Sequence, residues 1–468
     1  MNLNINNNKN KKKHSWKFWV IFWICAIVFL TAWAIFWEYK NNGYVGLIGM
    51  VKPAVNILPV EKQQKEELNT LLEVIPMVTG DNEEKTFLIL FQNNMELRPG
   101  GGFIGSFGIV KTKGEKVLSV ETHDTNIVDD RISSNIPMPY PMGEMLNVEH
   151  WELRDSNWSP DFKENAEMAD YLYHLEQGEE QFDGVVAIST ELLSSFLEIT
   201  GPVRLDNYPG EYNSENAVTK LEYQVERGYR EQNIEKGKRK YVIKELAQEI
   251  IDRAQDLSWG EKKKLLFALE DHMNNKDVMV YFSDKQVQEK FEELGWAGRV
   301  DDVDSDYLMM VDANLGALKT DAVIERSFEY RIDLSKEKPW ANLKITYNHT
   351  ARARDWMTDN YQSYLRVYVP EGSWLYDTEN IEVEKFGDEL GKKYFGMKVF
   401  VPINSSEIIE LSYDLLKDFD IENYDLLIQK QSGLDKLPGK VTIIDQNGIE
   451  RSYEIEIGSR WKLSELSE

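Results

Sequence analysis

An uncharged run of twenty residues, Phe18–Trp37, limits the possible folds of this chain more than any other feature. A helix of that length would measure about 30 Å, the thickness of the hydrocarbon core of a bilayer. The run is too long for the core of an ordinary signal peptide, and no small-residue cleavage motif follows it before Glu38. Tryptophans lie near both ends, where indole rings favour the headgroup region. We therefore predict an uncleaved transmembrane signal anchor at 18–37.

The charges around this run predict its orientation. The basic residues before it are Lys9, Lys11, Lys12, Lys13 and Lys17. Lys40 and Lys52 follow it. Because the cytoplasmic flank of an anchor carries the excess of lysine, we expect residues 1–17 to be a cytoplasmic tail and the chain beyond about residue 38 to be extracellular. The sequence thus predicts a single-pass cell-membrane protein, with a juxtamembrane stalk and helix at 38–80.

The amino-acid composition excludes several kinds of binding partner and metal site. The chain has 54 Lys and Arg against 80 Asp and Glu, a formal charge of −26, so sequence-independent nucleic-acid binding is not expected. A local basic site remains possible. Cys25 is the single cysteine, which excludes an intrachain disulfide framework and any multi-thiolate metal cluster. With 468 residues and 42% hydrophobic content, the chain is long enough for two or three packed domains.

Residues 81–320 have the pattern of an α/β domain with a mixed sheet and helices. Short apolar or alternating runs predict strands at 85–92, 103–112, 116–124 and 182–189. From about Ser214 the apolar spacing becomes helical, and Ser258-x-x-Glu261 is a capping box that opens a further helix. A strand at 277–283 and a short helix at 285–294 complete the pattern.

Residues 321–468 change character. Seven tracts alternate apolar and polar residues and are bounded by Gly, Pro or Asn: NLKITYNHT, YQSYLRVYVPEG, KYFGMKVFVP, SEIIELSYDL, YDLLIQKQSG, GKVTIIDQNG and SYEIEIG. About seven short strands of this kind predict an immunoglobulin-like β-sandwich domain.

One polar cluster leaves the end of the first predicted strand. Asn93, Glu96 and Arg98 are followed by three glycines, where the backbone must bend or approach another group closely. Ligands bind at strand ends in α/β sheets, which favours a binding role. The segment contains neither GxxxxGK[ST] nor a GxGxxG that opens a helix. The alternative is a Gly-rich turn in which Arg98 and Glu96 form a structural ion pair.

Two further clusters carry candidate site residues. Asp124 lies among acidic residues just after the third strand, and carboxylates of this kind are the ligands that Mg²⁺ and Ca²⁺ prefer. Arg154, Asp155 and Asp161 lie among large aromatic residues in WELRDSNWSPDF. An exposed acidic loop and mutually paired charges are the alternatives.

Eight motifs in order, from about Thr86 to the C-terminal strands, resemble an uncharacterised bacterial membrane-anchored family, domain of unknown function 4012. They are ELRPGGGFIGSFG, RDSNWSPDF, FDGVVAI with LEITGPV, GWAGRV, DANLGALKTD, and YLRVYVPEGS with LLIQKQSG. This resemblance implies no activity.

A remoter resemblance concerns the LytR-CpsA-Psr phosphotransferases, which move polyprenyl-pyrophosphate-linked glycopolymers onto peptidoglycan. LILFQNN, ELRPGGGFIGSFGIV and Thr122-His-Asp-Thr125 look like that family's strand-end motifs, and GKRKYVIKEL looks like its arginine-bearing helix. His123 stands where the family has an arginine, and Arg98-Pro-Gly lacks the family's carboxylate.

This resemblance implies a phosphotransferase. Arginines would neutralise the pyrophosphate, and a carboxylate would accept the proton of the acceptor hydroxyl. A metal such as Mg²⁺, bound by Asp124 with Asp155 or Asp161, would stabilise the leaving oxygen. The candidate catalytic residues are Arg98, Asp124, Arg154 and Asp161. The candidate ligand-binding residues are Asn93, Glu96, Lys238 and Arg239.

Two functions remain open. One is binding or transfer of a pyrophosphate-linked cell-envelope glycopolymer, with a cell-wall polymer or a polyprenyl-linked glycan as partner. The other is a non-catalytic surface binding or adhesion module. An enzyme requires Arg98, Asp124, Arg154 and Asp161 to surround one cleft, whereas a structural module would place them in separate ion pairs.

Overall fold

The computed structural model describes residues 55, 62–79, 83–114, 116–129, 135–316, 318–415 and 422–466. The predicted anchor at 18–37 lies outside these residues, and no helix within them is long and apolar enough to cross a bilayer. The chain forms two compact units: 1–84 with 112–116, and 85–111 with 117–468. The first contains helix α2 (Lys62–Thr79). The second contains the sheets and helices described below.

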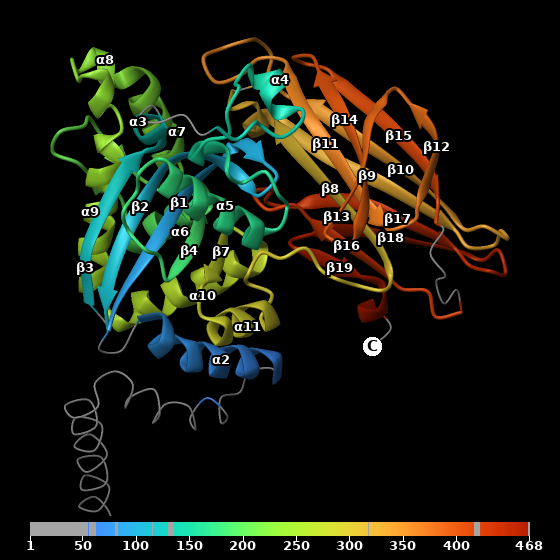
Figure 1. Cartoon of the computed structure of the whole chain (residues 1–468), viewed down its shortest axis with the longest axis horizontal. Coiled ribbons are helices and arrows are strands. Elements are labelled where there is room, and N and C mark those ends of the chain that lie inside the picture. The colour runs from blue at the N-terminus through green and yellow to red at the C-terminus, as the bar shows by residue number, and fades with distance from the viewer. Residues whose placement is uncertain are drawn as a thin grey trace, which may run out of the picture. The chain divides into compact units, whose positions relative to one another are not determined.

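The N-terminal part of the second unit has a mixed five-stranded sheet (Figure 1). Its order is β3-β2-β1-β4-β7. The strands are β1 (Glu84–Arg98), β2 (Gly101–Lys113), β3 (Lys116–Asp124), β4 (Gly184–Ser189) and β7 (Val278–Phe282). Strands β1 and β4 are parallel, with Gln92 opposite Ser189 at the end of the ladder, and β7 is antiparallel to β4. The predicted mixed α/β fold is confirmed.

Helices accompany this sheet. The longer ones are α5 (Phe162–Leu175), α6 (Thr190–Thr200), α7 (Ala217–Tyr223), α9 (Tyr241–Asp256), α10 (Trp259–Asn275) and α11 (Lys285–Glu293). The shorter elements are α3 (Thr125–Asp129), α4 (Met142–Leu146), α8 (Tyr229–Glu231), β5 (Val203–Arg204) and β6 (Glu211–Tyr212). The predicted capping box of Ser258 and Glu261 opens α10.

Alternation along β1 gives the sheet two different faces. Leu88 and Leu90 are fully buried in a core that includes residues of α5. Ile89 and Phe91 point to the opposite face and are only half-buried. One face of the sheet therefore supports a packed core, while the other leaves apolar side chains partly uncovered.

The C-terminal part consists of two six-stranded sheets (Figure 1). One has β12 (Trp374–Glu379), β15 (Ser406–Asp414), β10 (Trp340–His349), β9 (Ile324–Asp333), β17 (Leu437–Ile444) and β18 (Glu450–Ile457). The other has β13 (Val383–Glu389), β14 (Lys392–Val401), β11 (Tyr361–Pro370), β8 (Asp306–Asn314), β16 (Leu426–Lys430) and β19 (Arg460–Lys462). Buried residues of both sheets, such as Leu343 and Leu365, belong to one core.

All seven alternating tracts are strands, which confirms a β-rich C-terminal region. Strands β8, β9, β12, β13 and β19 complete the two sheets, and β8 lies within 81–320, the range predicted to be α/β. Each sheet contains a parallel pair, β8 with β16 and β9 with β17. These extra strands and parallel pairs differ from the antiparallel, seven-stranded arrangement expected for an immunoglobulin-like domain.

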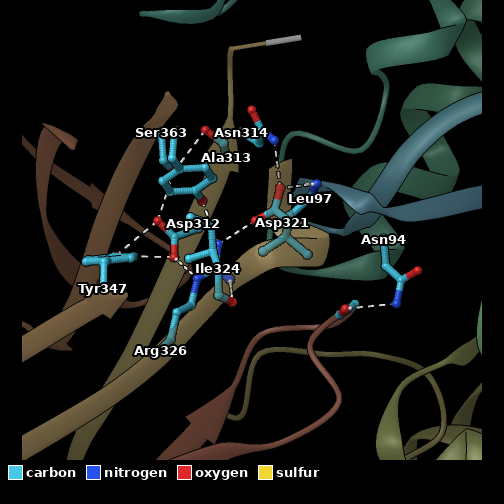
Figure 2. A network of polar contacts seen from close by, with 12 residues as sticks. Asn94, Leu97, Asp312, Ala313, Asn314, Asp321, Ile324, Arg326, Tyr347 and Ser363 are labelled. Carbon is cyan, nitrogen blue, oxygen red and sulfur yellow. Dashed lines mark hydrogen bonds and ion pairs between the residues drawn. The ribbon is translucent and has the colours of Figure 1, made fainter. Parts of the chain in front are cut away.

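A polar network ties the end of β1 to the two β-sheets (Figure 2). The Asp321 carboxylate accepts hydrogen bonds from the Leu97 backbone N–H at 2.9 Å and from the Asn314 amide at 2.7 Å. Asp321 also pairs with Arg326, whose Nε donates to Asp312 at 2.9 Å. The sheet end that carries the predicted site is therefore held directly against the C-terminal strands.

Candidate functional site

A cavity of about 1370 Å³ lies on the uncovered face of the α/β sheet. Ile89, Phe91 and Ile188 of the sheet line it, and α6, α7, α9 and α10 contribute the facing wall. Cavities for drug-sized ligands have volumes of about 300–1,000 Å³, so this one has room for a larger ligand.

Helix α9 explains much of the apolar wall. A stripe of Val242, Leu246 and Ile250 packs in a local core, with Val242 and Leu246 buried. A second stripe, Ile243, Ala247 and Ile251, runs beside it and lines the cavity. The helix is therefore apolar over a wider arc than packing on one neighbour requires. This second stripe is the sequence signal from which the cavity could have been predicted.

The cavity has a charged region where β1 ends. Arg98 lies there but is only 2% exposed, and its guanidinium is engaged on several sides. It donates to the Asn314 carbonyl at 2.6 Å and to Glu96 at 3.1 Å, and its Nε lies 3.5 Å from Asp155. Burial raises the pKa of Glu96, and the positive charge of Arg98 opposes that rise. The alternative of a structural Arg98–Glu96 ion pair is thus what the structure contains.

The three glycines after Arg98 serve close packing. A Cβ added to Gly102 would lie 2.3 Å from the Asn93 backbone. Gly101 has a φ of +126°, and a Cβ there would lie 2.2 Å from the Gln92 side chain. This segment therefore brings β1 and β2 together where they join.

Arg154 also lines the cavity and is surrounded by carboxylates. It pairs with Glu152, and its Nε lies 3.6 Å from Asp129 and 3.7 Å from Asp155. Asp129 is almost fully buried next to Glu176, and burial raises the pKa of both carboxyls. Glu152 and Asp155 therefore already compensate the positive charge of Arg154.

The other two predicted catalytic residues lie outside the large cavity. Asp124 lines an adjoining cavity of about 200 Å³ and binds the Lys240 ammonium at 2.7 Å. Asp161 caps α5 by accepting from the Lys163 backbone at 3.0 Å, and Arg299 binds it at 2.8 Å. Arg98 and Arg154 thus share a cavity, while Asp124 and Asp161 do not line it.

Asn93, Glu96 and Arg239, three of the predicted ligand-binding residues, line the large cavity. Lys238 does not line it and instead pairs with Glu235 at 2.9 Å, with its side chain 52% exposed.

The predicted metal ligands do not fit a magnesium ion. Asp124 forms an ion pair with the ammonium group of Lys240. Asp155 lies between the guanidinium groups of Arg98 and Arg154. Among the described residues, no group of three or more His, Cys, Asp or Glu side chains is placed to hold a metal.

Two arginines that the sequence analysis did not select line the same cavity. Arg227 lies in a π-helical turn, Gln224–Gly228, and its guanidinium lies 5.7 Å from the centre of the Trp356 ring. Arg230 donates to the Tyr229 hydroxyl at 2.8 Å. Within the described part of the chain, neither has a carboxylate at salt-bridge distance. Single π-helical turns often mark functional sites, but the predicted helix gave no sign of this one.

Three polar residues that the sequence did not single out form a hydrogen-bonded row. His272 binds Ser195 through Nε2 and Asp277 through Nδ1, each at 2.8 Å. This order resembles a Ser-His-Asp triad. However, Ser195 lies inside α6, where the helix uses the backbone N–H groups that an oxyanion would need, and none of the three lines the large cavity. We interpret the hydrogen bonds of Ser195, His272 and Asp277 as a clamp that holds α6 against α10.

Comparison with known proteins gives a family match for part of the chain. Residues 82–225 match the family described as "Protein of unknown function (DUF4012)". This range includes β1 to β4 and the cavity helices α6 and α7. The comparison with curated proteins finds no match.

Solved structures are similar only in part. The Streptococcus agalactiae protein gbs0355 is 14% identical, with 48% of this chain and 76% of that chain covered and a TM-score of 0.31. The Listeria innocua protein Lin1025 is 11% identical, with 47% and 81% covered and a TM-score of 0.26. None of these findings gives evidence for the remoter resemblance to the LytR-CpsA-Psr phosphotransferases.

Proposed function

We propose that the large cavity binds an amphiphile with a long apolar chain and an anionic head group, such as a prenyl phosphate or pyrophosphate that carries a cell-envelope glycopolymer. One observation carries this proposal: a single cavity combines an extended apolar wall with Arg227 and Arg230, whose charges no carboxylate in the described chain compensates at salt-bridge distance.

The state of the remaining cations supports binding through these two arginines. Arg98 is paired with Glu96, and Arg154 is paired with Glu152 and Asp155, so an incoming phosphate would have to displace these carboxylates. A phosphate near Arg227 and Arg230 would gain charge-assisted hydrogen bonds without breaking an ion pair. The geometry favours a binding module over a phosphotransferase, because each predicted catalytic group is paired with a different charged residue of the chain.

The proposal includes the anchor predicted at 18–37. A chain fixed to the outer surface of the cell membrane by this segment would present the cavity where lipid-linked envelope polymers reside. The −26 charge of the chain suits a solvated surface outside the cell.

A binding comparison between a fluorescent prenyl phosphate and the matching prenyl alcohol tests this proposal. The purified full chain should bind the phosphate more tightly. Arg227→Gln with Arg230→Gln should weaken phosphate binding by about tenfold or more and leave alcohol binding unchanged. Ala247→Trp, which fills the apolar part, should weaken both.

Arg204→Gln is a matched control, because this arginine is exposed and lies outside the cavity. Equal affinity for the phosphate and the alcohol, or no binding of either, would contradict the proposal.

A further inference from the structure

A second cavity of about 1010 Å³ lies where the α/β part meets the C-terminal sheets. We call it the junction groove. Residues at the end of β1 and at the starts of α6 and α7 form one wall, and β9, β10 and the segment after β16 form the other. Asn94 crosses between the walls by donating to the Gly433 carbonyl at 3.3 Å (Figure 2).

The junction groove adjoins the large cavity. Thr190 and Val218 line both of them. Thr190 begins α6, directly after the strand whose last residue, Ser189, pairs with Gln92. A ligand that leaves the large cavity at these residues therefore passes into the groove.

The lining of the groove offers hydrogen-bonding groups that are not in use. The hydroxyls of Ser194, Thr219, Ser327 and Thr346 make no side-chain hydrogen bond within the described part of the chain. Hydroxyls both donate and accept, which suits a ligand that carries many hydroxyl groups.

The side chains that line the groove carry a net negative charge. Arg326 is committed to Asp312 and Asp321, and Lys436 pairs with Glu456 at 2.8 Å. The carboxylates of Glu215 and Asp435 have no ion-pair partner among the described residues. A polyanion would be repelled here, whereas an ammonium group would be attracted.

From this geometry we infer that the junction groove binds a carbohydrate that is neutral or carries amino groups, and that it excludes acidic sugars. The carbohydrate would be the polar portion of the amphiphile whose chain occupies the large cavity, and this link rests on the proposed function. The C-terminal sheets then supply half of the binding site.

Calorimetric titration of the full chain at low salt tests the inference with three soluble probes: tetramers of glucosamine, N-acetylglucosamine and galacturonic acid. Glucosamine tetramer should bind most tightly, N-acetylglucosamine tetramer more weakly, and galacturonate tetramer not at all. Binding of galacturonate as tight as that of glucosamine, or no binding of any tetramer, would overturn it.

Charge-removing variants locate the binding. Glu215→Gln with Asp435→Asn preserves side-chain shape and should weaken glucosamine binding by about tenfold, with N-acetylglucosamine binding unchanged. Thr346→Trp should weaken both by filling the groove. Glu382→Gln, an exposed carboxylate outside the groove, should alter neither. Equal losses in Glu382→Gln and in the groove variants would overturn the assignment.

The two proposals fail separately. The tetramers carry no apolar chain, so they report on the groove alone, and the prenyl phosphate reports on the large cavity. Tetramer binding without prenyl phosphate binding refutes the proposed function and retains the groove. Prenyl phosphate binding without tetramer binding supports the proposed function and refutes the assignment of the groove.

Discussion

At the scale of single residues, Arg98 shows how a functional-looking pattern can have a structural cause. The sequence predicts a charged cluster at a strand end, and the cluster exists. The sequence does not reveal the partner of this arginine. The guanidinium of Arg98 donates a hydrogen bond to the backbone carbonyl of Asn314, more than two hundred residues away. Pairing partners that are distant in the chain decide whether a cation is free for a ligand, and local spacing carries no information about them.

Arg98→Met should therefore destabilise the protein severely. Glu96 and Asp155 would remain buried without their cation, which costs about 3–5 kcal/mol. Urea unfolding should show a lowered midpoint, whereas Arg204→Met, at an exposed pair, should change stability by less than about 1 kcal/mol. Wild-type stability in Arg98→Met would refute the structural role.

The buried carboxyl pair predicts a pH dependence of stability. Burial, with Glu176 nearby, raises the pKa of Asp129 to about 9. The folded protein thus keeps a proton that the unfolded chain releases above its ordinary pKa of about 3.9. This contribution to stability is fully present below about pH 4 and is lost as the pH rises towards about 9.

Thermal melts between about pH 5 and pH 9 should show a falling melting temperature in the wild type. Asp129→Asn should flatten this slope, because the asparagine cannot release a proton. An unchanged slope in the variant would show that other groups control the pH dependence.

At the scale of elements, regular local signals were the most predictable. The alternating tracts and the Ser258 capping box specified strands and a helix start from neighbouring residues alone, and the structure confirms them. The π-helical turn at Gln224–Gly228 was not predictable, because its apolar spacing fits an ordinary helix. The short β12 and β13 have mostly exposed side chains and lack a clear alternating pattern.

The clamp between α6 and α10 gives a prediction at this scale. His272→Ala removes two side-chain hydrogen bonds, one of them to a carboxylate, and should cost about 2 kcal/mol. Hydrogen exchange should accelerate in α10 and α6 while β10 and β11 keep their protection. His150→Ala is the control, because 40% of this side chain is exposed and it lies outside α6 and α10. Uniform acceleration in all elements would argue against a local clamp.

At the scale of the whole molecule, the sequence predicted the division into an α/β part and a β-rich part but not how they are joined. The change from helical to alternating patterns near residue 321 is visible locally. Strand β8 is fully buried and its central run 307–311 is apolar, which fits either a sheet of the α/β part or a sandwich strand. Its place between β11 and β16 depends on pairing with residues far along the chain.

This placement predicts how fragments behave. A fragment of residues 300–468 should give a strand-dominated circular dichroism spectrum and a cooperative melt, because it includes β8. A fragment of residues 321–468 lacks this central strand and should not melt cooperatively. Cooperative folding of the shorter fragment would show that β8 is dispensable for the sandwich.

The parallel pairing of β8 with β16 also means that β8 is synthesised well before its partner strand. Ribosomes add about 5–20 residues per second, and β16 lies about 110 residues beyond the end of β8, so β8 waits roughly 6–20 s for that partner. Strand β9 waits in the same way for β17. Each sheet therefore has an unpaired strand edge, a known template for aggregation, until nearly the last residues emerge. A ribosome that stalls before β16 leaves both edges open at once, so the nascent chain depends on whatever shields it during that interval.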